Sequence, residues 1–469
     1  MIAAPKSGSG KTVITCALLH ALKKRGEKAV SYKCGPDYID PMFHEKALGV
    51  SSFNLDTFFT DEKTTKGLFM KHALEGDTAV LEGVMGLYDG LGGIREEGSA
   101  YHLAKVTGTP IVLAVDVRGM GYSILPFLAG FLAYDTERLI KGVILNRISK
   151  GFFETIKPLI ESRLPLSVPG FLTDEKEFQL ESRHLGLVMP DELEDMRAKL
   201  TYMSEKFEET VSVPAILEIA EEAGELSGGD EDNCLPGKAP EAASLPGGVP
   251  EKKYPVIAVA KDEAFCFYYK DNLLMLEEKG AEIRYFSPLH DRKLPGDCSG
   301  LLLGGGYPEL YAKQLSRNKD MRMAVKHAAE KGMPIVAECG GFMYLHSALT
   351  DKAGIKHAMA GVIPAECFDT GALVRFGYIE IQEKESGFFL PEGESIKAHE
   401  FHYYDSTDNG GCALAVKPGT GKSYSCVIAD KNCWMGFPHL YYPSNPVFAE
   451  AFVRKARKYM ELLFKKMPD

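Results

Sequence analysis

The segment PKSGSGKT at residues 5–12 decides the fold of the first half of the chain. A short apolar strand is predicted just before it at Ile2–Ala4, and an amphipathic helix just after it at Thr12–Arg25. In this order, the glycines let backbone N–H groups turn towards a phosphate, and the start of the helix adds its positive end. The pattern predicts a P-loop, in which Lys11 reaches the terminal phosphates and the Thr12 hydroxyl binds Mg²⁺.

Apolar runs alternate with helix-like segments along the rest of this half. The candidate strands after the first are Ala29–Cys34, Thr78–Glu82, Pro110–Asp116 and Lys141–Asn146. Each is a continuous apolar run, which is typical of strands that are buried on both faces. The alternation predicts a doubly wound α/β domain with a parallel sheet.

Polar side chains stand at the ends of these strands, where open α/β sheets bind their ligands. Asp37 and Asp40 lie on a loop stiffened by glycine and proline, and their carboxylates suit Mg²⁺ or a polar substrate. A carboxylate at the end of an apolar strand is costly unless it meets a cation, so Glu82 is the predicted metal ligand. Asp116 and Asn146 end the next two strands. We therefore expect these strand ends to share one ligand site.

The composition changes between Gly224 and Lys253, where six Gly and four Pro occur in 30 residues. Such a stretch cannot bury enough apolar surface to offset its ordering entropy, which predicts a flexible linker at residues 224–253. A long surface loop inside one domain is the alternative. A second strand–helix series follows, with strands predicted at Val256–Ala260, Glu282–Phe286, Gly300–Leu303 and Pro334–Glu338. The chain is therefore predicted to hold two doubly wound domains, residues 1–223 and 254–469.

The segment PIVAECGGF at residues 334–342 predicts a strand that runs into a sharp turn and then a helix. Small residues after Cys339 permit a strained elbow that exposes a nucleophile, and the start of a helix lowers a thiol pKa. The glycine-rich loop Gly304–Gly306 can offer backbone N–H groups to an oxyanion. Together these features predict a cysteine nucleophile.

Such a nucleophile needs a base from elsewhere in the chain. His439, near the end of the domain, is the preferred candidate among the twelve histidines. His399 and His402 compete with it. Their segment has a β-rich context, so substrate contact or a structural role is favoured for that pair over metal binding.

The overall composition excludes several classes of protein. The 469 residues carry a net charge of −11, and no basic run argues for nucleic acid or an anionic membrane as partner. No apolar stretch reaches the about 18 residues that a membrane span needs, and no signal peptide is predicted. The ten cysteines contain no C-x-x-C pair. A protein of the cytoplasm with reduced thiols is therefore expected.

Taken together and in this order, the motifs of the chain resemble those of the cobyrinic acid a,c-diamide synthase family along almost the whole length. The resemblance rests on the segments at residues 4–12, 35–41 (GPDYIDP), 82–90 (EGVMGLYDG), 183–187 (RHLGL), 304–309 (GGGYPE), 338–341 (ECGG) and 399–403 (HEFHY). Pro5, which stands where a P-loop usually begins with glycine, is shared with the family.

The resemblance implies an N-terminal domain similar to dethiobiotin synthetase and a C-terminal class I glutamine amidotransferase domain. MgATP, glutamine and a corrin precursor are the implied ligands, and the a and c carboxylates of the corrin are amidated as acyl phosphates. The implied ATP contacts are Gly8, Ser9, Gly10, Lys11, Thr12 and Asn146, and the implied metal ligands are Thr12 and Glu82. Asp37, Tyr38, Asp40 and Asp89 fall on the substrate or metal loops, without individual roles.

In the C-terminal domain, the resemblance implies that Cys339 attacks the glutamine carboxamide and that His439 raises its nucleophilicity. Gly305, Gly306 and Gly340 are then the oxyanion and glutamine site. Class I amidotransferases usually carry a glutamate two residues after the histidine, and here that position is Tyr441. The third member of the set is therefore unassigned.

Other readings stay open from the sequence. Hydrogenobyrinic acid and nickel-sirohydrochlorin are alternative tetrapyrrole substrates, and cobyric acid synthases share the architecture. A MinD-like ATPase switch is the alternative of a different class, with Lys6 reaching a partner subunit and a non-catalytic C-terminal module. A homodimer is an assembly state that the sequence leaves open.

Overall fold

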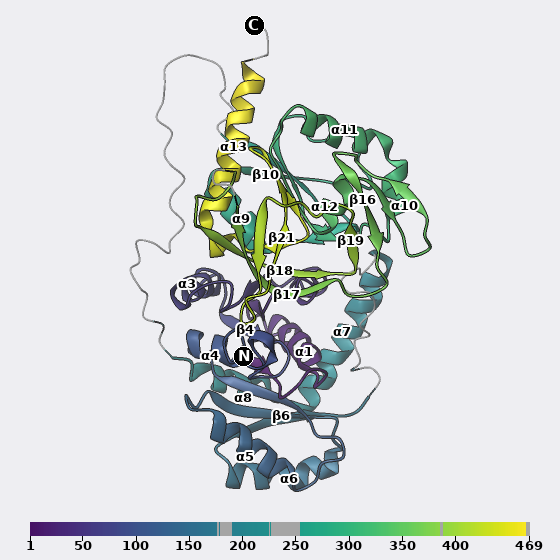
Figure 1. The fold of residues 1–469 in the computed structure, drawn as a ribbon. Helices are drawn as coiled ribbons and strands as arrows, with labels where there is room; N and C mark the ends of the chain where they lie inside the picture. The colour runs from purple at the N-terminus through teal and green to yellow at the C-terminus, as the bar shows by residue number, and fades with distance from the viewer. Residues whose placement is uncertain (176–177, 179–189, 225, 227–253, 385–387, 466–469) are drawn as a thin grey trace, which may run out of the picture. The chain divides into compact units, whose positions relative to one another are not determined.

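The computed structural model describes residues 1–175, 178, 190–224, 226, 254–384 and 388–465. The motif at residues 183–187 lies outside these ranges, as does most of the predicted linker. The chain divides into two compact units, Met1–Leu235 and Pro236–Asp469, which are drawn in purple to blue and in green to yellow in Figure 1. Each unit has its own sheet and its own apolar core.

The first unit is built on a seven-stranded sheet with the order β3-β2-β4-β1-β5-β6-β7. Every neighbouring pair is parallel. The strands are β1 (Ile2–Ala3), β2 (Ala29–Cys34), β3 (Ser52–Leu55), β4 (Thr78–Glu82), β5 (Ile111–Asp116), β6 (Ile140–Asn146) and β7 (Ser167–Leu172). The strand order reverses at β1, so right-handed crossovers wind the chain in both directions from the centre. This confirms the predicted doubly wound sheet.

The helices of this unit connect the strands and follow the last of them. They are α1 (Lys11–Lys24), α2 (Ile39–Phe43), α3 (Glu62–Ala73), α4 (Ala100–Thr107), α5 (Ile124–Tyr134), α6 (Lys150–Arg163), α7 (Pro190–Thr210) and α8 (Val213–Glu221). A π-helical turn, η1 (His44–Leu48), continues α2, and a short 3₁₀ turn, η2 (Leu91–Gly93), precedes α4. Helix α1 packs its apolar residues, among them Ile14 and Leu18, into the core beside β1 and β4.

The second unit has a six-stranded central sheet with the order β10-β8-β11-β13-β23-β22. Its strands are β8 (Val256–Ala260), β10 (Glu282–Phe286), β11 (Cys298–Leu303), β13 (Ile335–Glu338), β22 (Ile428–Ala429) and β23 (Cys433–Gly436). The first five in the spatial order are parallel, and β22 is antiparallel to β23. This confirms the predicted second doubly wound sheet.

Smaller sheets surround the central one. The pair β9 (Phe265–Phe267) and β12 (Gly305–Gly306) is antiparallel. A four-stranded sheet contains β14 (His346–Thr350), β15 (Lys356–Ala358), β16 (Ile363–Asp369) and β19 (Tyr404–Ser406). A five-stranded antiparallel sheet contains β17 (Arg375–Glu383), β18 (Ser395–His402), β20 (Ala413–Val416), β21 (Ser423–Cys426) and β24 (His439–Leu440). These sheets were not predicted as such, because the sequence indicated only a β-rich context.

The helices of the second unit are α9 (Lys270–Glu278), α10 (Ala312–Arg317), α11 (Lys319–Glu330), α12 (Gly340–Leu345) and α13 (Pro446–Phe464), with a 3₁₀ turn η4 (Tyr442–Ser444) before the last. The single tryptophan of the chain, Trp434, lies on β23 inside this unit's core and is 1% exposed. Its ring meets Phe448 of α13 edge to face, with the ring centroids 5.2 Å apart. None of the described helices is both long enough and apolar enough to cross a bilayer.

Candidate functional site

The predicted P-loop follows β1 at the centre of the first sheet and runs directly into α1. Gly8 and Gly10 have φ of +75° and +97°, a backbone conformation that glycine adopts without strain. The side chain of Asn146, at the end of β6, donates a hydrogen bond of 2.9 Å to the Ser9 carbonyl. A Cβ on Gly10 would overlap this amide, so the close approach requires a glycine there. Asn146 therefore supports the loop backbone.

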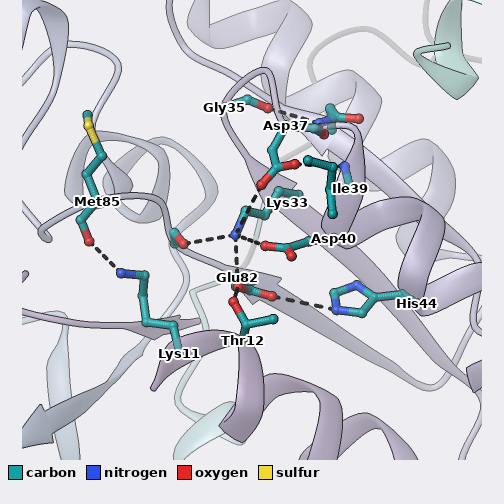
Figure 2. A network of polar contacts seen from close by, with 12 residues as sticks. Lys11, Thr12, Lys33, Gly35, Asp37, Ile39, Asp40, His44, Glu82 and Met85 are labelled. Atoms are coloured by element: carbon teal, nitrogen blue, oxygen red, sulfur yellow. Dashed lines mark hydrogen bonds and ion pairs between the residues drawn. The ribbon is translucent and has the colours of Figure 1, made fainter. Parts of the chain in front are cut away.

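Lys11 and Thr12 point towards the loop that follows β4 (Figure 2). The Lys11 amine donates to the Met85 carbonyl over 2.6 Å, and the Thr12 hydroxyl donates to Glu82 Oε1 over 2.7 Å. Burial, followed by the positive charge of Lys33, lowers the pKa of Lys11 to about 8. The residues that follow the P-loop thus contact the end of β4 and the loop after it, as expected for strand ends that lie at one edge of the sheet.

Lys33, near the end of β2, occupies the middle of this cluster (Figure 2). Its amine contacts Glu82 Oε1 at 2.8 Å, forms a short hydrogen bond to Asp40, and lies 4.0 Å from Asp37 Oδ2. Burial disfavours the charged amine, but the carboxylates of Glu82, Asp40 and Asp37 outweigh burial and raise the pKa of Lys33. Burial and the charge of Asp40 raise the pKa of Glu82 to about 7.

His44 lies behind Glu82 and is fully buried. Its Nε2 is 3.6 Å from Glu82 Oε2, and its Nδ1 is 2.9 Å from the Ser31 hydroxyl. Burial lowers the pKa of His44 to about 4, so the ring is neutral at neutral pH. No role was predicted for Lys33 or His44. A lysine inside an otherwise apolar strand was the available signal for Lys33, since a buried lysine needs carboxylate partners.

The remaining residues of the substrate and metal loops lie around this cluster. Asp37 Oδ1 accepts a hydrogen bond of 2.7 Å from the Ile39 N–H, which caps the turn into α2, and Tyr38 is buried beside it. Asp89 Oδ2 accepts from the Gly86 N–H over 3.0 Å and holds the loop after β4. Asn54 of β3, which the sequence did not indicate, donates to the carbonyls of Gly35 and Asp37.

Asp116 at the end of β5 pairs with arginines rather than with the Lys33 cluster. Its Oδ2 is 2.7 Å from Arg147 and 3.1 Å from Arg118. Arg147 also donates to the Gly8 carbonyl over 3.1 Å. The predicted sharing of one site therefore holds for Glu82 and Asp40, whereas Asp116 reaches the P-loop only through Arg147.

The hydroxyl oxygen of Thr12 and the carboxylate oxygens of Glu82 suit Mg²⁺, because Mg²⁺ prefers hard oxygen ligands. Glu82 Oε2 is buried and has no hydrogen-bond partner among the described residues. The described residues contain no group of three or more His, Cys, Asp or Glu side chains that could hold a metal by themselves. Mg²⁺ at nucleotide sites usually has one or two protein oxygens and completes its shell with phosphate and water, which agrees with this arrangement.

The predicted elbow is present in the second unit, between β13 and α12. Cys339 has φ of +47° and ψ of −105°, a strained conformation for a residue other than glycine. Its N–H donates to the Gly436 carbonyl of the neighbouring strand β23 over 2.8 Å. The Gly341 N–H donates to the Gly304 carbonyl over 2.9 Å, and a Cβ on Gly341 would overlap the Leu303 backbone. The elbow is thus held tightly against the glycine loop.

The pKa of the Cys339 thiol is raised, not lowered as the sequence predicted. Burial is the largest cause, followed by the nearby charge of Glu309, and these outweigh the hydrogen bond from the Gly340 N–H. The expectation from the helix start was wrong because only 7% of Cys339 is exposed. The thiol therefore needs a base to lose its proton.

His439 is the first residue of β24, and its partner in register on β18 is His399. Its ring faces Gly305 so closely that a Cβ there would overlap Cε1. Burial, followed by the charges of His399 and His402, lowers the pKa of His439 to about 3, so the ring is neutral at neutral pH. Gly306 has φ of +151°, and a Cβ on Gly340 would meet the Gly306 nitrogen at 3.2 Å. Gly340, which follows Cys339 in the chain, is therefore close to Gly306, and the adjacent Gly305 faces His439.

The contacts of His402 are those of a residue with a structural role, which is one of the two roles that the sequence favoured for it. It lies on β18 rather than on a helix, so the spacing of three puts His399 and His402 on opposite faces of a strand. His402 stacks on Phe437 at 4.0 Å between ring centroids, and its Nδ1 is 2.7 Å from the Tyr404 carbonyl.

Comparison with known proteins assigns both halves of the chain to families. Residues 1–188 match the CobQ/CobB/MinD/ParA nucleotide binding domain family, and residues 256–446 match the CobB/CobQ-like glutamine amidotransferase domain family. A cobyrinate a,c-diamide synthase of Caldanaerobacter subterraneus is 38% identical over 443 residues, which cover 94% of each chain. Those of Listeria innocua and Dehalococcoides mccartyi are 38% and 36% identical, over 95% and 98% of this chain and 96% and 98% of theirs. The chain therefore belongs to the cobyrinate a,c-diamide synthase family.

Proposed function

We propose that this protein uses ATP and glutamine to convert the a and c side-chain carboxylates of cobyrinic acid into amides, in cobalamin biosynthesis. The observation that carries the proposal is the pair of sites in one chain. One unit holds the P-loop with Lys11 and the Thr12–Glu82 contact, and the other holds Cys339 at an elbow beside His439. Neither site alone makes an amide from a carboxylate when glutamine is the nitrogen source.

In the first unit, the carboxylate oxygen of the corrin attacks the terminal phosphorus of ATP, which yields an acyl phosphate and ADP. Lys11 and the loop N–H groups position the phosphates and neutralise their charge. Thr12 and Glu82 would hold Mg²⁺, which supplies further neutralisation when it is bound. Ammonia then attacks the acyl carbon, and phosphate leaves with the former carboxylate oxygen.

In the second unit, the Cys339 sulfur attacks the carboxamide carbon of glutamine while His439 takes the thiol proton. The N–H groups near Gly305, Gly306 and Gly340 stabilise the oxyanion. His439 then gives the proton to the leaving ammonia, and water hydrolyses the thioester to glutamate. A MinD-like switch with a non-catalytic C-terminal module does not account for the elbow and the base.

Each step is assigned to one part of the chain. Residues 1–223 form the amidoligase domain, 224–253 a flexible linker and 254–469 the glutaminase domain. We expect the enzyme to act in the cytoplasm, without nucleic acid or membrane as partner, and a homodimer stays an open assembly state to test.

Mass spectrometry of cobyrinic acid incubated with the purified protein, glutamine and MgATP tests the proposal. We expect two exchanges of hydroxyl for amine, with ATP and glutamine both required. Unchanged cobyrinic acid beside intact glutaminase activity would contradict this acceptor. Parallel incubations with hydrogenobyrinic acid and nickel-sirohydrochlorin then distinguish the related substrates.

A further inference from the structure

We infer that the carboxyl group of Glu338, the residue immediately before the nucleophile, positions His439 by accepting a hydrogen bond from its Nδ1–H group. The inference rests on the proposed glutaminase function and supplies the third member of the set, for which the usual position is Tyr441. Glu338 would be a positioning residue, since it acts on substrate only through His439.

The geometry links Glu338 to β24 at two points. Glu338 is the last residue of β13, and its Oε2 lies 3.9 Å from His439 Nδ1. The same carboxyl group accepts a hydrogen bond from the backbone N–H of Leu440, the residue after His439. Both residues are buried, Glu338 being 6% and His439 3% exposed. The carboxyl group thus lies next to both residues of the two-residue strand β24, and it is hydrogen-bonded to the second of them.

The surroundings of Glu338 argue against a purely structural role, because the buried carboxyl group lowers the stability of the fold. Burial raises the pKa of Glu338 to about 8, and its Oε1 has no hydrogen-bond partner among the described residues. The hydroxyls of Tyr268 and Tyr442 are near enough for the Glu338 charge to raise their pKa values. A buried carboxyl group with an unsatisfied oxygen costs stability, and such groups concentrate at functional sites.

The chemistry needs one tautomer of His439. A neutral imidazole has one donor nitrogen and one acceptor nitrogen. If Nδ1 carries the proton and its N–H donates a hydrogen bond to Glu338, Nε2 is left as the acceptor for the Cys339 thiol. The present 3.9 Å is longer than a hydrogen bond, and such contacts often tighten only when substrate is bound.

Tyr441 is the competing candidate because of its position in the sequence. Its hydroxyl lies 3.4 Å from Asp271 Oδ2, and its ring meets Tyr269 edge to face. Asp271 belongs to α9, so this contact ties η4 and β24 to that helix. We therefore expect Tyr441 to contribute to packing rather than to the orientation of His439.

The test uses the full chain and compares glutamine hydrolysis with ammonia-dependent amidation in the same preparation. Glu338→Gln replaces the acceptor with an amide that can donate to Nδ1. It should lower kcat for glutamine hydrolysis about 100-fold, with KM for glutamine changed by less than about 3-fold. Ammonia-dependent amidation should be unchanged, and Glu338→Asp should recover part of the lost kcat.

The matched controls are Tyr441→Phe and Glu383→Gln, and both should keep the original kcat. Glu383 is a half-buried carboxylate of the same unit that accepts from loop N–H groups at Phe388, Phe389 and Leu390. An unchanged kcat in Glu338→Gln would overturn the inference, and so would a loss confined to Tyr441→Phe.

A measurement on the unmodified protein decides the matter even where a variant fails to fold. Isotope-labelled histidine NMR, with His439 assigned by the signal missing from His439→Asn, should show the tautomer protonated at Nδ1. A tautomer protonated at Nε2 would overturn the inference. An unmodified protein that hydrolyses no glutamine would instead contradict the proposed function, so the two failures are distinguishable.

Discussion

Lys33 is a permanent cation in the first site, held between acids that would otherwise repel one another. Its side chain is 4% exposed, whereas Glu82 is fully buried and Asp40 lies close by. Desolvation of such charges is costly, and their mutual attraction repays it only while every partner is present. The amine therefore keeps Glu82 and Asp40 together at the place where the Thr12 hydroxyl also contacts Glu82.

Replacement of Lys33 by methionine should destabilise the first unit by about 3–5 kcal/mol, because two buried carboxylates lose their counter-charge. Urea unfolding followed by circular dichroism measures the change. The double variant Lys33→Met/Glu82→Gln should recover much of the loss, since only Asp40 then stays charged. A Lys33→Met protein as stable as the original would show that the cation does not hold the cluster together.

At the level of elements, the glutaminase site depends on the fit between β12 and β24. Gly305 of β12 pairs with Phe267 of β9, and its Cα faces the imidazole of His439. The sequence marked Gly305 as a source of N–H groups, but the structure shows that its missing side chain also makes room for the base.

Gly305→Ala should therefore displace the His439 ring and lower glutamine hydrolysis about 100-fold, the usual cost of a misplacement of about 1 Å. Ammonia-dependent amidation should be unaffected. Gly296→Ala is the matched control, because a Cβ there meets nothing within 4 Å and should leave both rates unchanged. Equal rates in Gly305→Ala and the original protein, measured as glutamate release, would refute this packing constraint.

The sequence predicted most of the parallel strands, because each is a short segment rich in apolar residues between helix-like segments. Strands β2, β4, β8 and β10 have the predicted bounds. The antiparallel sheet that carries His439 could not be predicted in the same way. Its two-residue strand β24 exists only through pairing with β18, far away in sequence. The lysine at the centre of the acid cluster was missed for the related reason that one of its partners, Glu82, is 49 residues away in the sequence.

At the scale of the whole molecule, the two units are expected to carry separable activities. Cys339→Ala should abolish glutamine-dependent amidation and spare ammonia-dependent amidation, because only the nucleophile is lost. Cys412→Ala, a half-buried cysteine of the same unit, is the control. Mass spectrometry of the corrin product with either nitrogen source checks this. Loss of both activities in a folded Cys339→Ala protein would contradict the division.

The converse variant is Lys11→Ala, which should lower ATP-driven amidation by about 100-fold or more while glutamine hydrolysis continues. Lys6→Ala is its control on the same loop. Lys6 is exposed, and a switch mechanism would need it whereas the proposed ligase would not. Full amidation by Lys11→Ala, followed as product formation with ammonia, would refute the role of the P-loop.

The fluorescence of the single tryptophan allows the second unit to be observed separately from the first. Since Trp434 lies in the core of the second unit, the indole emission of the whole chain reports on that unit alone. A spectral shift or quenching upon addition of glutamine would be a local signal. A change produced by nucleotide, which binds elsewhere, would instead record communication between the two halves, without any label attached to the protein.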